Sequence, residues 1–228
     1  MNYHQFTYST YKKGIIYADL IFNKFVVANN PKKILDCGCG SGAYISSAIS
    51  LTKAQIDGVD LDLHPELSRF DSVERVSLFE EDILKFGKNF SKKYDVILAL
   101  NIIEHFNYEE GRDLIDILLS RLNLNGILIM QFPNMSVPNG ISTFYSDNTH
   151  LHSYTKASFL QLSKTLKNKY SSIKVYNTPF VNNRIDRYLR YLISKFFRFS
   201  LMINLVCEKG ISYINEPLSP NIIAVIKK

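Results

Sequence analysis

The sequence has 228 residues, a net charge of +6 and an apolar share that is ordinary for a globular protein with a sizeable core. It holds neither an uncharged apolar run of 18 residues nor a basic–apolar–small leader, so we expect no spanning helix and no signal peptide. Its three cysteines, two of them in Cys37-Gly38-Cys39, suit neither a disulfide framework nor the usual zinc spacing, which predicts reduced thiols and a cytoplasmic location.

The charge is unevenly distributed along the chain. Residues 1–149 carry 14 Lys and Arg against 18 Asp and Glu, whereas residues 150–228 carry 13 against 3. A positive field over the C-terminal third would attract phosphorylated or otherwise anionic small molecules. A solvated basic surface would have the same composition, so both interpretations stay open.

Apolar periodicity predicts an α/β protein with helices on both faces of its sheet. A helix over 11–29 ends before Pro31, and strands then alternate with helices, which is typical of a mostly parallel sheet. The predicted strands are 33–37, 55–60, 75–79, 94–100, 126–132, 171–177 and 221–226, and the further helices are 42–51, 64–70, 108–122, 156–169 and 183–206. Two stretches have no predicted element, an irregular one that ends at Asn89 and a loop over 133–155.

The first strand runs directly into the turn Asp36-Cys37-Gly38-Cys39-Gly40-Ser41-Gly42. Glycines allow a sharp turn and a close approach of ligand to backbone, and the following helix offers unpaired N–H groups. An ordinary strand-to-helix junction also needs glycines, so this turn alone does not define a site.

Polar side chains stand at the ends of the following strands. Asp60 ends the second strand, at the spacing that a ribose-binding acid has after a glycine turn. Glu80-Glu81-Asp82-Ile83 follows the third strand, and Asn101-Ile102-Ile103-Glu104-His105 follows the fourth. Ligands of parallel sheets bind beyond the carboxyl ends of the strands, so these residues are expected to face one site.

This series resembles the class I S-adenosylmethionine (SAM) dependent methyltransferases over about residues 30 to 135, in the order D-x-G-x-G-x-G, V-D, E-D-I and E-H-F. The resemblance implies a Rossmann-like fold with a mostly parallel seven-stranded sheet, with SAM as cofactor and S-adenosylhomocysteine as product. It places Asp36 near the ammonium group, Asp60 on the ribose hydroxyls, Asp82 with Ile83 at the adenine, and Asn101 near the methionine end. The full set of implied cofactor residues is Asp36, Gly38, Gly40, Gly42, Asp60, Leu61, Asp82, Ile83 and Asn101.

The loop over 133–155 is long for a compact domain, and its aromatic and histidine residues favour a functional loop. Its segment Ser146-Asp147-Asn148-Thr149-His150, with Pro133-Asn134 and the stretch from Pro220 to Lys227, resembles methyltransferases from bacterial capsule and O-antigen gene clusters. That second resemblance implies O-methylation of a sugar, a nucleotide-linked sugar or a substituent of either in surface polysaccharide biosynthesis.

A hydroxyl acceptor must lose its proton, and histidine is the natural acceptor near neutral pH. We expect His150 to be the base or a substrate ligand, with Asp147 orienting it. His152 in that role, or both histidines as structural anchors, are the alternatives. His150, His152 and Asp147 also invite a divalent ion, but without a third clear ligand we expect no metal. His105 and Tyr145 are expected to line the substrate cleft.

The helix over 183–206 interleaves arginines with aromatic residues. The preferred interpretation is a helix packed on the sheet or on a partner subunit, with its arginines in water. The alternative is a basic amphipathic surface for phosphate groups, a polyanionic glycan or the inner membrane. We expect Arg184 and Arg187 near a phosphate-bearing substrate. Peripheral membrane contact and a homodimer stay open.

We expect one methyltransferase domain over 1–228, with a helical cap (1–30), a SAM-binding core (31–132), the substrate loop (133–155) and a C-terminal half (156–228). Methylation of another small metabolite, such as a quinone precursor, and an inactive SAM-binding partner subunit are the alternatives. Nucleic acid is not expected as a partner. Amino-group methylation of bases in the resembled superfamily usually shows Asn/Asp-Pro-Pro-aromatic after strand four, where this chain has Asn101-Ile102-Ile103-Glu104. Cytosine C5 methylation needs a Pro-Cys nucleophile, and this chain has none there.

Overall fold

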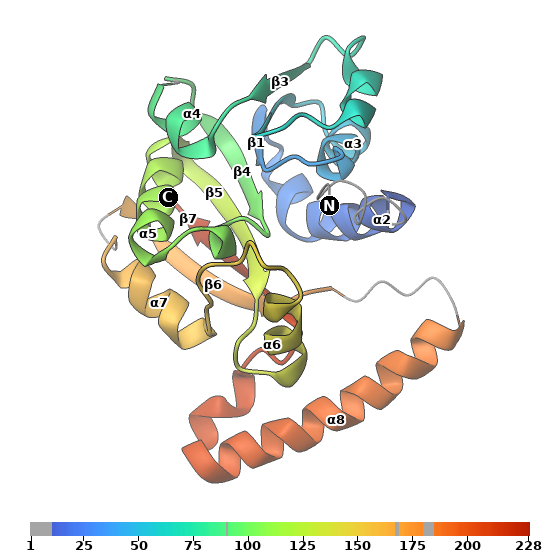
Figure 1. Ribbon diagram of the computed structural model, residues 1–228, viewed down its shortest axis with the longest axis vertical. Coiled ribbons are helices and arrows are strands. Elements are labelled where there is room, and N and C mark those ends of the chain that lie inside the picture. Colours follow the sequence, from blue (N-terminus) through green and yellow to red (C-terminus); the bar gives the residue numbers. More distant parts are fainter. Residues whose placement is uncertain (1–10, 90, 167–168, 180–184) are drawn as a thin grey trace.

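The computed structural model describes residues 11–89, 91–166, 169–179 and 185–228, and Figure 1 shows an α/β body with one long helix along its lower side. The strands are β1 (Lys33–Cys37), β2 (Gln55–Asp60), β3 (Val76–Glu80), β4 (Tyr94–Leu100), β5 (Leu122–Pro133), β6 (Ser172–Asn177) and β7 (Asn221–Lys227). The α-helices are α2 (Tyr11–Ile21), α3 (Ala43–Leu51), α4 (Ile83–Asn89), α5 (Tyr108–Ser120), α6 (Pro138–Tyr145), α7 (Lys156–Lys164) and α8 (Ile185–Lys209). Short 3₁₀ turns are η4 (Pro65–Phe70), η5 (Ile103–His105) and η7 (Ile211–Asn215).

The seven strands form one sheet in the order β3-β2-β1-β4-β5-β7-β6. Strands β1 to β5 pair in parallel, whereas β7 pairs antiparallel with both β5 and β6. The expected Rossmann-like fold with a mostly parallel seven-stranded sheet is therefore confirmed. The strand order reverses between β1 and β4, and the crevice beyond their carboxyl ends is where such sheets bind ligands.

Helices cover both faces of the sheet because the central strands are apolar on both sides. Leu35 and Ile97 face a core completed by α5 and α7, and their strand neighbours Ile34 and Val96 face a core completed by α2 and α3. Burial of both faces fixes the strand register, since a shift by one residue would exchange every side chain between the two cores. This rigid sheet holds the loops at its carboxyl edge.

Two stretches that we predicted to be irregular contain helices. The Asp82 Oδ1 accepts hydrogen bonds from the N–H groups of Leu84 and Lys85, at 2.9 and 3.0 Å, and so caps α4. In the loop over 133–155, α6 begins at Pro138, which suits a first helical turn because its missing N–H would have had no partner. The helix predicted over 11–29 is helical throughout, but its second half is a π turn followed by a 3₁₀ turn.

Helix α8 does not pack its apolar side chains against the sheet in its described part. Phe196, Phe197 and Phe199 are 69%, 65% and 57% exposed, and Figure 1 shows α8 lying apart from the body. Packing on the sheet, one half of the preferred interpretation, is therefore wrong for these residues, while packing on a partner subunit stays a prediction. Among the described residues, no helix has both the length and the apolar character needed to cross a membrane.

Candidate active site

The glycine turn after β1 is tied to β2 by backbone hydrogen bonds. The N–H groups of Gly38 and Cys39 donate to the Val59 carbonyl oxygen at 2.8 and 3.2 Å, and the Gly40 N–H donates to Asp60 Oδ2 at 2.7 Å. Gly38 has a φ of 71°, and a Cβ there would lie 2.0 Å from Ile102 Cδ1. The positive φ favours glycine at this position, and any larger residue would also displace the Ile102 side chain, while the turn is held against the acid that ends β2.

Asp36 is a buried carboxylate whose charge lacks compensation. It is 1% exposed, and neither carboxylate oxygen has a hydrogen-bond partner among the described residues. Burial, together with the nearby charge of Asp60, raises the pKa of Asp36 to about 7. An unpaired buried carboxylate beside a glycine turn suits the ammonium group of an amino acid. The residues present therefore fit the amino-acid end of SAM.

The other implied cofactor residues lie along the same carboxyl edge of the sheet, which we call the cofactor edge. Asp82 uses one carboxylate oxygen to cap α4, where buried Ile83 is the first residue, while Leu61 after β2 is 71% exposed. Asn101 follows β4 in the left-handed conformation, with a φ of 58°, and its Oδ1 accepts a hydrogen bond from Gln131 Nε2 at 3.0 Å.

The N-terminal helix contributes a tyrosine to this edge that the sequence analysis missed. The Tyr17 hydroxyl donates to Gln131 Oε1, so α2 is linked through Gln131 to Asn101. Burial raises the pKa of Tyr17 and of Tyr44 in α3, and the charges of Tyr17 and Asp36 raise the Tyr44 value further. Helix α2 thus packs over the side of the edge where Asp36 and Asn101 lie, and no local motif marks Tyr17, Tyr44 or Gln131 in the sequence.

A cluster of imidazoles and carboxylates lies where the segment after β4 meets the loop after β5. The His105 Nδ1 lies 2.9 Å from the Thr149 hydroxyl oxygen, and that hydroxyl donates to Asp147 Oδ1 at 2.6 Å. Since the Thr149 proton points to Asp147, the hydroxyl can only accept from His105, which assigns the His105 proton to Nδ1. The His105 Nε2 is then left with a lone pair.

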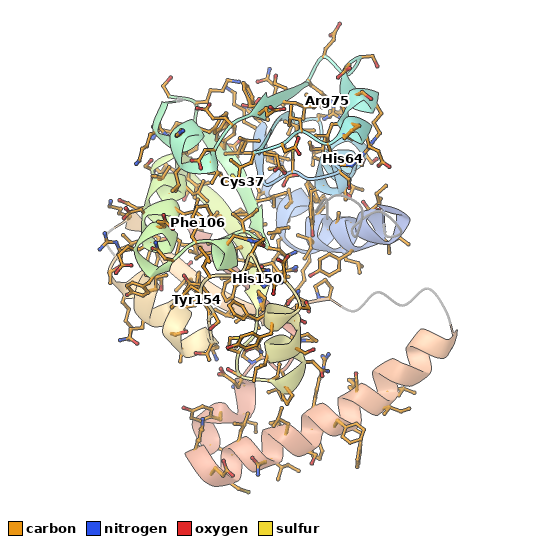
Figure 2. All side chains as sticks on the ribbon, viewed as in Figure 1. Cys37, His64, Arg75, Phe106, His150 and Tyr154 are labelled. Carbon is orange, nitrogen blue, oxygen red and sulfur yellow. The ribbon has the colours of Figure 1, made fainter. Side chains whose placement is uncertain are left out.

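His150 has the same tautomer for a different reason. Its Nδ1 lies 2.7 Å from the Phe144 carbonyl oxygen, which can only accept. The rings of His105 and His150 meet edge to face, with centroids 4.7 Å apart. Asp147 Oδ2 lies 4.0 Å from His150 Nε2, beyond hydrogen-bond distance. Figure 2 labels His150 in the lower half of the α/β body.

Glu104 is the third member of this cluster that offers a ligand atom. It is 1% exposed, and its Oε2 lacks a hydrogen-bond partner within the described ranges. Burial raises the pKa of Glu104 to about 8, and the charge of Asp147 acts in the same direction. The ligand atoms of Glu104, His105 and His150 all lie within 4.8 Å of one another. Neither its burial nor its open oxygen could be read from the E-H pair in the sequence.

The electrostatics of the cluster favour a neutral His105 beside an ionised Asp147. Burial and the neighbouring His150 lower the pKa of His105. Burial alone would raise the pKa of Asp147, but hydrogen bonds from Thr149 outweigh it and hold the pKa below its usual range. A neutral imidazole can accept a proton, and an adjacent carboxylate would stabilise the resulting cation.

The remaining predicted substrate residues have other surroundings. His152 packs edge to face against Tyr108 and Tyr154, with ring centroids 5.8 and 4.7 Å away. Tyr145 is 74% exposed and packs on Phe144. Arg184 lies outside the described residues, and of Arg187 only the backbone, in α8, is described. His64 is a cap, since its Nδ1 accepts from the Glu66 N–H at 3.0 Å.

The fold and the cofactor edge define a SAM-dependent methyltransferase. A family model described as a methyltransferase domain matches residues 16–166, so the chain belongs to that family. The chain is similar over its whole length to a SAM-dependent methyltransferase from Archaeoglobus fulgidus, with a TM-score of 0.68 and 14% identity over 100% of both chains. It is also similar to the N-methyltransferase NodS from Bradyrhizobium japonicum in complex with S-adenosylhomocysteine, with a TM-score of 0.58, 12% identity and coverage of 95% of this chain and 86% of that one.

Curated relatives match a shorter part of the chain. A tRNA1(Val) (adenine(37)-N6)-methyltransferase from Yersinia enterocolitica is 31% identical over 90 residues, which cover 35% of this chain and 35% of that protein. The same enzyme from Yersinia pestis is 32% identical over 90 residues, covering 35% and 36%. The chain thus spans about a third of the length of the curated relatives it matches.

Proposed function

We propose that this methyltransferase transfers the methyl group of SAM to a hydroxyl of a sugar, a nucleotide-linked sugar or its substituent, in the biosynthesis of a bacterial surface polysaccharide. One observation carries this proposal. Two imidazoles, His105 and His150, lie where the segment that begins at Asn101 meets the loop after β5, and Asn101 is the residue expected beside the methionine end of the cofactor. A hydroxyl acceptor needs such a group, because its proton must leave during or after methyl transfer.

SAM brings an already activated methyl group, so the chain mainly has to bind, orient and exclude water. Asp36 would hold the ammonium group, Asp60 the ribose hydroxyls, and Asp82 with Ile83 the adenine. Glycine at 38, 40 and 42 would let the cofactor lie against the turn. Tyr17 and Gln131 would close the site from the side of α2.

His150 would receive the acceptor hydroxyl at its Nε2. Its Nδ1–H is fixed on the Phe144 carbonyl, so the ring presents a lone pair in a fixed orientation. Once the ring takes the proton, Asp147 is close enough to stabilise the positive charge. His105 supports this arrangement, because its edge contact and its bond to Thr149 limit rotation of both the ring and the loop.

The loop that carries His150 is joined to the segment that carries Glu104. The N–H groups of Leu151 and His152 donate to the Glu104 carbonyl oxygen at 2.8 and 3.2 Å. These bonds hold the acceptor side in register with the strand end that carries Asn101. The net positive charge of residues 150–228 would favour an acceptor with phosphate groups, such as a nucleotide-linked sugar.

Adenine methylation in tRNA is the second candidate, because the Yersinia relatives have that name. Against it stands the sequence after β4, where Asn101 is followed by Ile102 and Ile103 in place of the Pro-Pro-aromatic expected for amino-group methylation. Ile103 is 0% exposed and Glu104 is 1% exposed, so neither offers a surface on which a flipped base could stack.

The test is a screen that measures S-adenosylhomocysteine release with each acceptor class. Purified protein is incubated with SAM and a panel of nucleotide sugars, and in parallel with unmodified tRNA transcripts. Turnover with a nucleotide sugar, lost in His150→Ala, is the expected result. Turnover with tRNA alone would replace the sugar proposal by the second candidate. Binding of S-adenosylhomocysteine without turnover on either panel would favour a quinone-type metabolite or an inactive partner subunit.

A further inference from the structure

We infer that Glu104, His105 and His150 form a binding site for a divalent first-row transition metal ion. Their ligand atoms lie within 4.8 Å of one another, and two imidazoles with one carboxylate is a donor set that suits such ions and leaves coordination positions open. Ligands around an ion with bonds of about 2.1 Å lie about 3 Å apart, so modest side-chain rotations would complete the site.

Each imidazole can ligate an ion through Nε2, because its Nδ1 is the nitrogen next to the Thr149 hydroxyl or the Phe144 carbonyl. Both imidazoles donate from Nδ1, His105 to the Thr149 hydroxyl and His150 to the Phe144 carbonyl. In metal sites a ligating imidazole donates its other N–H to a neighbouring oxygen, which fixes the ring and the tautomer. This outer shell already exists here, and it extends through Thr149 to the carboxylate of Asp147.

Glu104 is the second, independent observation. A carboxylate that is 1% exposed and has an open Oε2 within the described part of the chain is costly unless something compensates its charge. A divalent cation would supply that charge. The ion considered from the sequence would have used His150, His152 and Asp147. The structure instead places His152 between Tyr108 and Tyr154, while Glu104 provides the third ligand.

The role of the ion rests on the proposed function. An acceptor hydroxyl bound to the ion would have a lowered pKa and would release its proton to water, since His150 would then hold the ion through Nε2 and could not itself take the proton. Metal binding itself does not depend on the acceptor. It is therefore measured without SAM and without any acceptor, so that its failure is distinct from failure of the proposed function.

The experiment titrates chelator-treated protein with Mn²⁺ and with Zn²⁺, and counts bound ion by equilibrium dialysis and calorimetry. We expect one equivalent of ion in the wild type, and affinity about tenfold or more weaker in Glu104→Gln, His105→Ala and His150→Ala. His152→Ala is the matched control and should bind like the wild type. The Zn²⁺ titration uses a Cys207→Ser background, because Cys207 is an exposed thiol.

Two results would overturn the inference. One is that the wild type takes up neither ion, and the other is uptake that all three ligand variants retain. Circular dichroism of each variant checks folding. Glu104→Gln keeps the inference testable if a histidine variant unfolds, because it preserves the shape of a buried side chain and removes only its charge.

A second inference rests on α8 and on observations other than those at this cluster. Leu192, Phe196, Phe199 and Ile203 recur at helical spacing and are 44%, 69%, 57% and 46% exposed. Ile193 and Phe197 widen this surface, and the six residues together are called the α8 apolar face. Contiguous exposed apolar patches on helices mark protein or membrane contacts.

We infer that the α8 apolar face lies on an anionic lipid surface. Charge decides between a membrane and a second copy of the chain. Residues 150–228 carry 13 Lys and Arg against 3 Asp and Glu, so a second copy would bring two positive regions together, whereas anionic lipid headgroups complement them. A helix with aromatic residues on one face and basic residues elsewhere is typical of helices that lie in the membrane interface.

The test is cosedimentation with vesicles of phosphatidylcholine, alone or with phosphatidylglycerol. We expect binding to the anionic vesicles, weakened by salt and lost in the double variant Phe196→Ser, Phe199→Ser. Leu124→Ser is the matched control, since Leu124 is 82% exposed at the start of β5. Absence of vesicle binding would overturn the inference. A concentration-dependent dimer that the double variant loses, without vesicle binding, would assign the face to a second copy.

Discussion

Two regions of the candidate site are constructed in different ways. The cofactor edge is the carboxyl edge of the sheet with Asp36, Asp60, Asp82 and Asn101, and the acceptor cluster consists of Glu104, His105, Asp147 and His150. The expected cofactor residues lie in the last two positions of a strand or within the five residues after it, so a strand end and the next few residues are enough to position them. The acceptor cluster joins residues 104–105 to residues 144–150 through loop hydrogen bonds. The first arrangement follows from the sheet, and the second depends on how two loops meet. Chemistry can therefore change at the second without disturbing the first.

The largest expected effect comes from a substitution in the acceptor cluster that should change turnover and leave cofactor binding intact. His150→Ala should lower kcat by about a hundredfold or more, the usual contribution of a group that handles the proton. Affinity for S-adenosylhomocysteine should stay unchanged, because His150 lies outside the cofactor edge. Steady-state kinetics and calorimetry measure the two quantities, with His152→Ala as the control. Equal losses in kcat and in cofactor affinity would contradict this separation of the two regions.

The next effect is on the cofactor side. Asp60→Ala removes the acceptor of the Gly40 N–H bond and of the expected ribose bonds, so affinity for S-adenosylhomocysteine should fall about a hundredfold, as the loss of two charged hydrogen bonds predicts. Asp62→Ala is the calorimetric control, because Asp62 is an exposed acid two residues after the end of β2. If both variants bind like the wild type, Asp60 does not hold the ribose.

Substitution of Asp36 by Asn should raise stability and weaken cofactor binding. Its pKa of about 7 lies above the value of about 3.9 in an unfolded chain. Between these values the folded protein keeps a proton that the unfolded chain has lost, so stability without SAM should fall as pH rises from about 4 to about 7. Asp36→Asn should remove this slope and raise Tm at pH 8 by several degrees, at about 2–4 °C per kcal/mol.

The same Asp36→Asn variant should bind S-adenosylhomocysteine more weakly, since an amide cannot compensate an ammonium charge. Thermal melts from pH 5 to 8, with and without the ligand, measure both effects. If Asp36→Asn is destabilised at pH 8, or binds S-adenosylhomocysteine like the wild type, Asp36 is not the residue that binds the ammonium group.

The smallest effect joins α2 to the cofactor edge. Tyr17→Phe deletes the hydroxyl that donates to Gln131 and leaves the ring in place. One neutral hydrogen bond is worth about 1 kcal/mol, so affinity for S-adenosylhomocysteine should fall by about fivefold. Tyr108→Phe, next to His152, is the control for loss of a hydroxyl. Unchanged affinity in Tyr17→Phe would mean that α2 packs on the site without holding it closed.

The fold could be predicted because its signals are local. Apolar runs marked the seven strands to within a few residues, and the glycine turn with Asp60 indicated the cofactor edge. The helix α4 was missed because its capping residue, Asp82, had been assigned to the adenine alone. The helix α6 was missed because Pro138 and the surrounding polar residues are equally typical of a loop.

The acceptor side was predicted only in part, because its contacts are between distant segments. His150 and Asp147 were named from one short motif. The sequence could not indicate that Glu104 is buried with an open oxygen, nor that Thr149 fixes the His105 tautomer. It also predicted α8 to pack on the sheet or on a partner subunit, although an amphipathic pattern alone does not say what covers an apolar face.

The connection between β6 and β7 leaves the sheet and returns to it at adjacent points. Asn177 at the end of β6 pairs with Ile222 at the start of β7, while α8 and η7 lie between them. When both ends of a connection are fixed side by side, the entropic cost of closing it rises only with the logarithm of its length. This connection is therefore where the chain can change in length without altering the sheet, the cofactor edge or the register of the last strand.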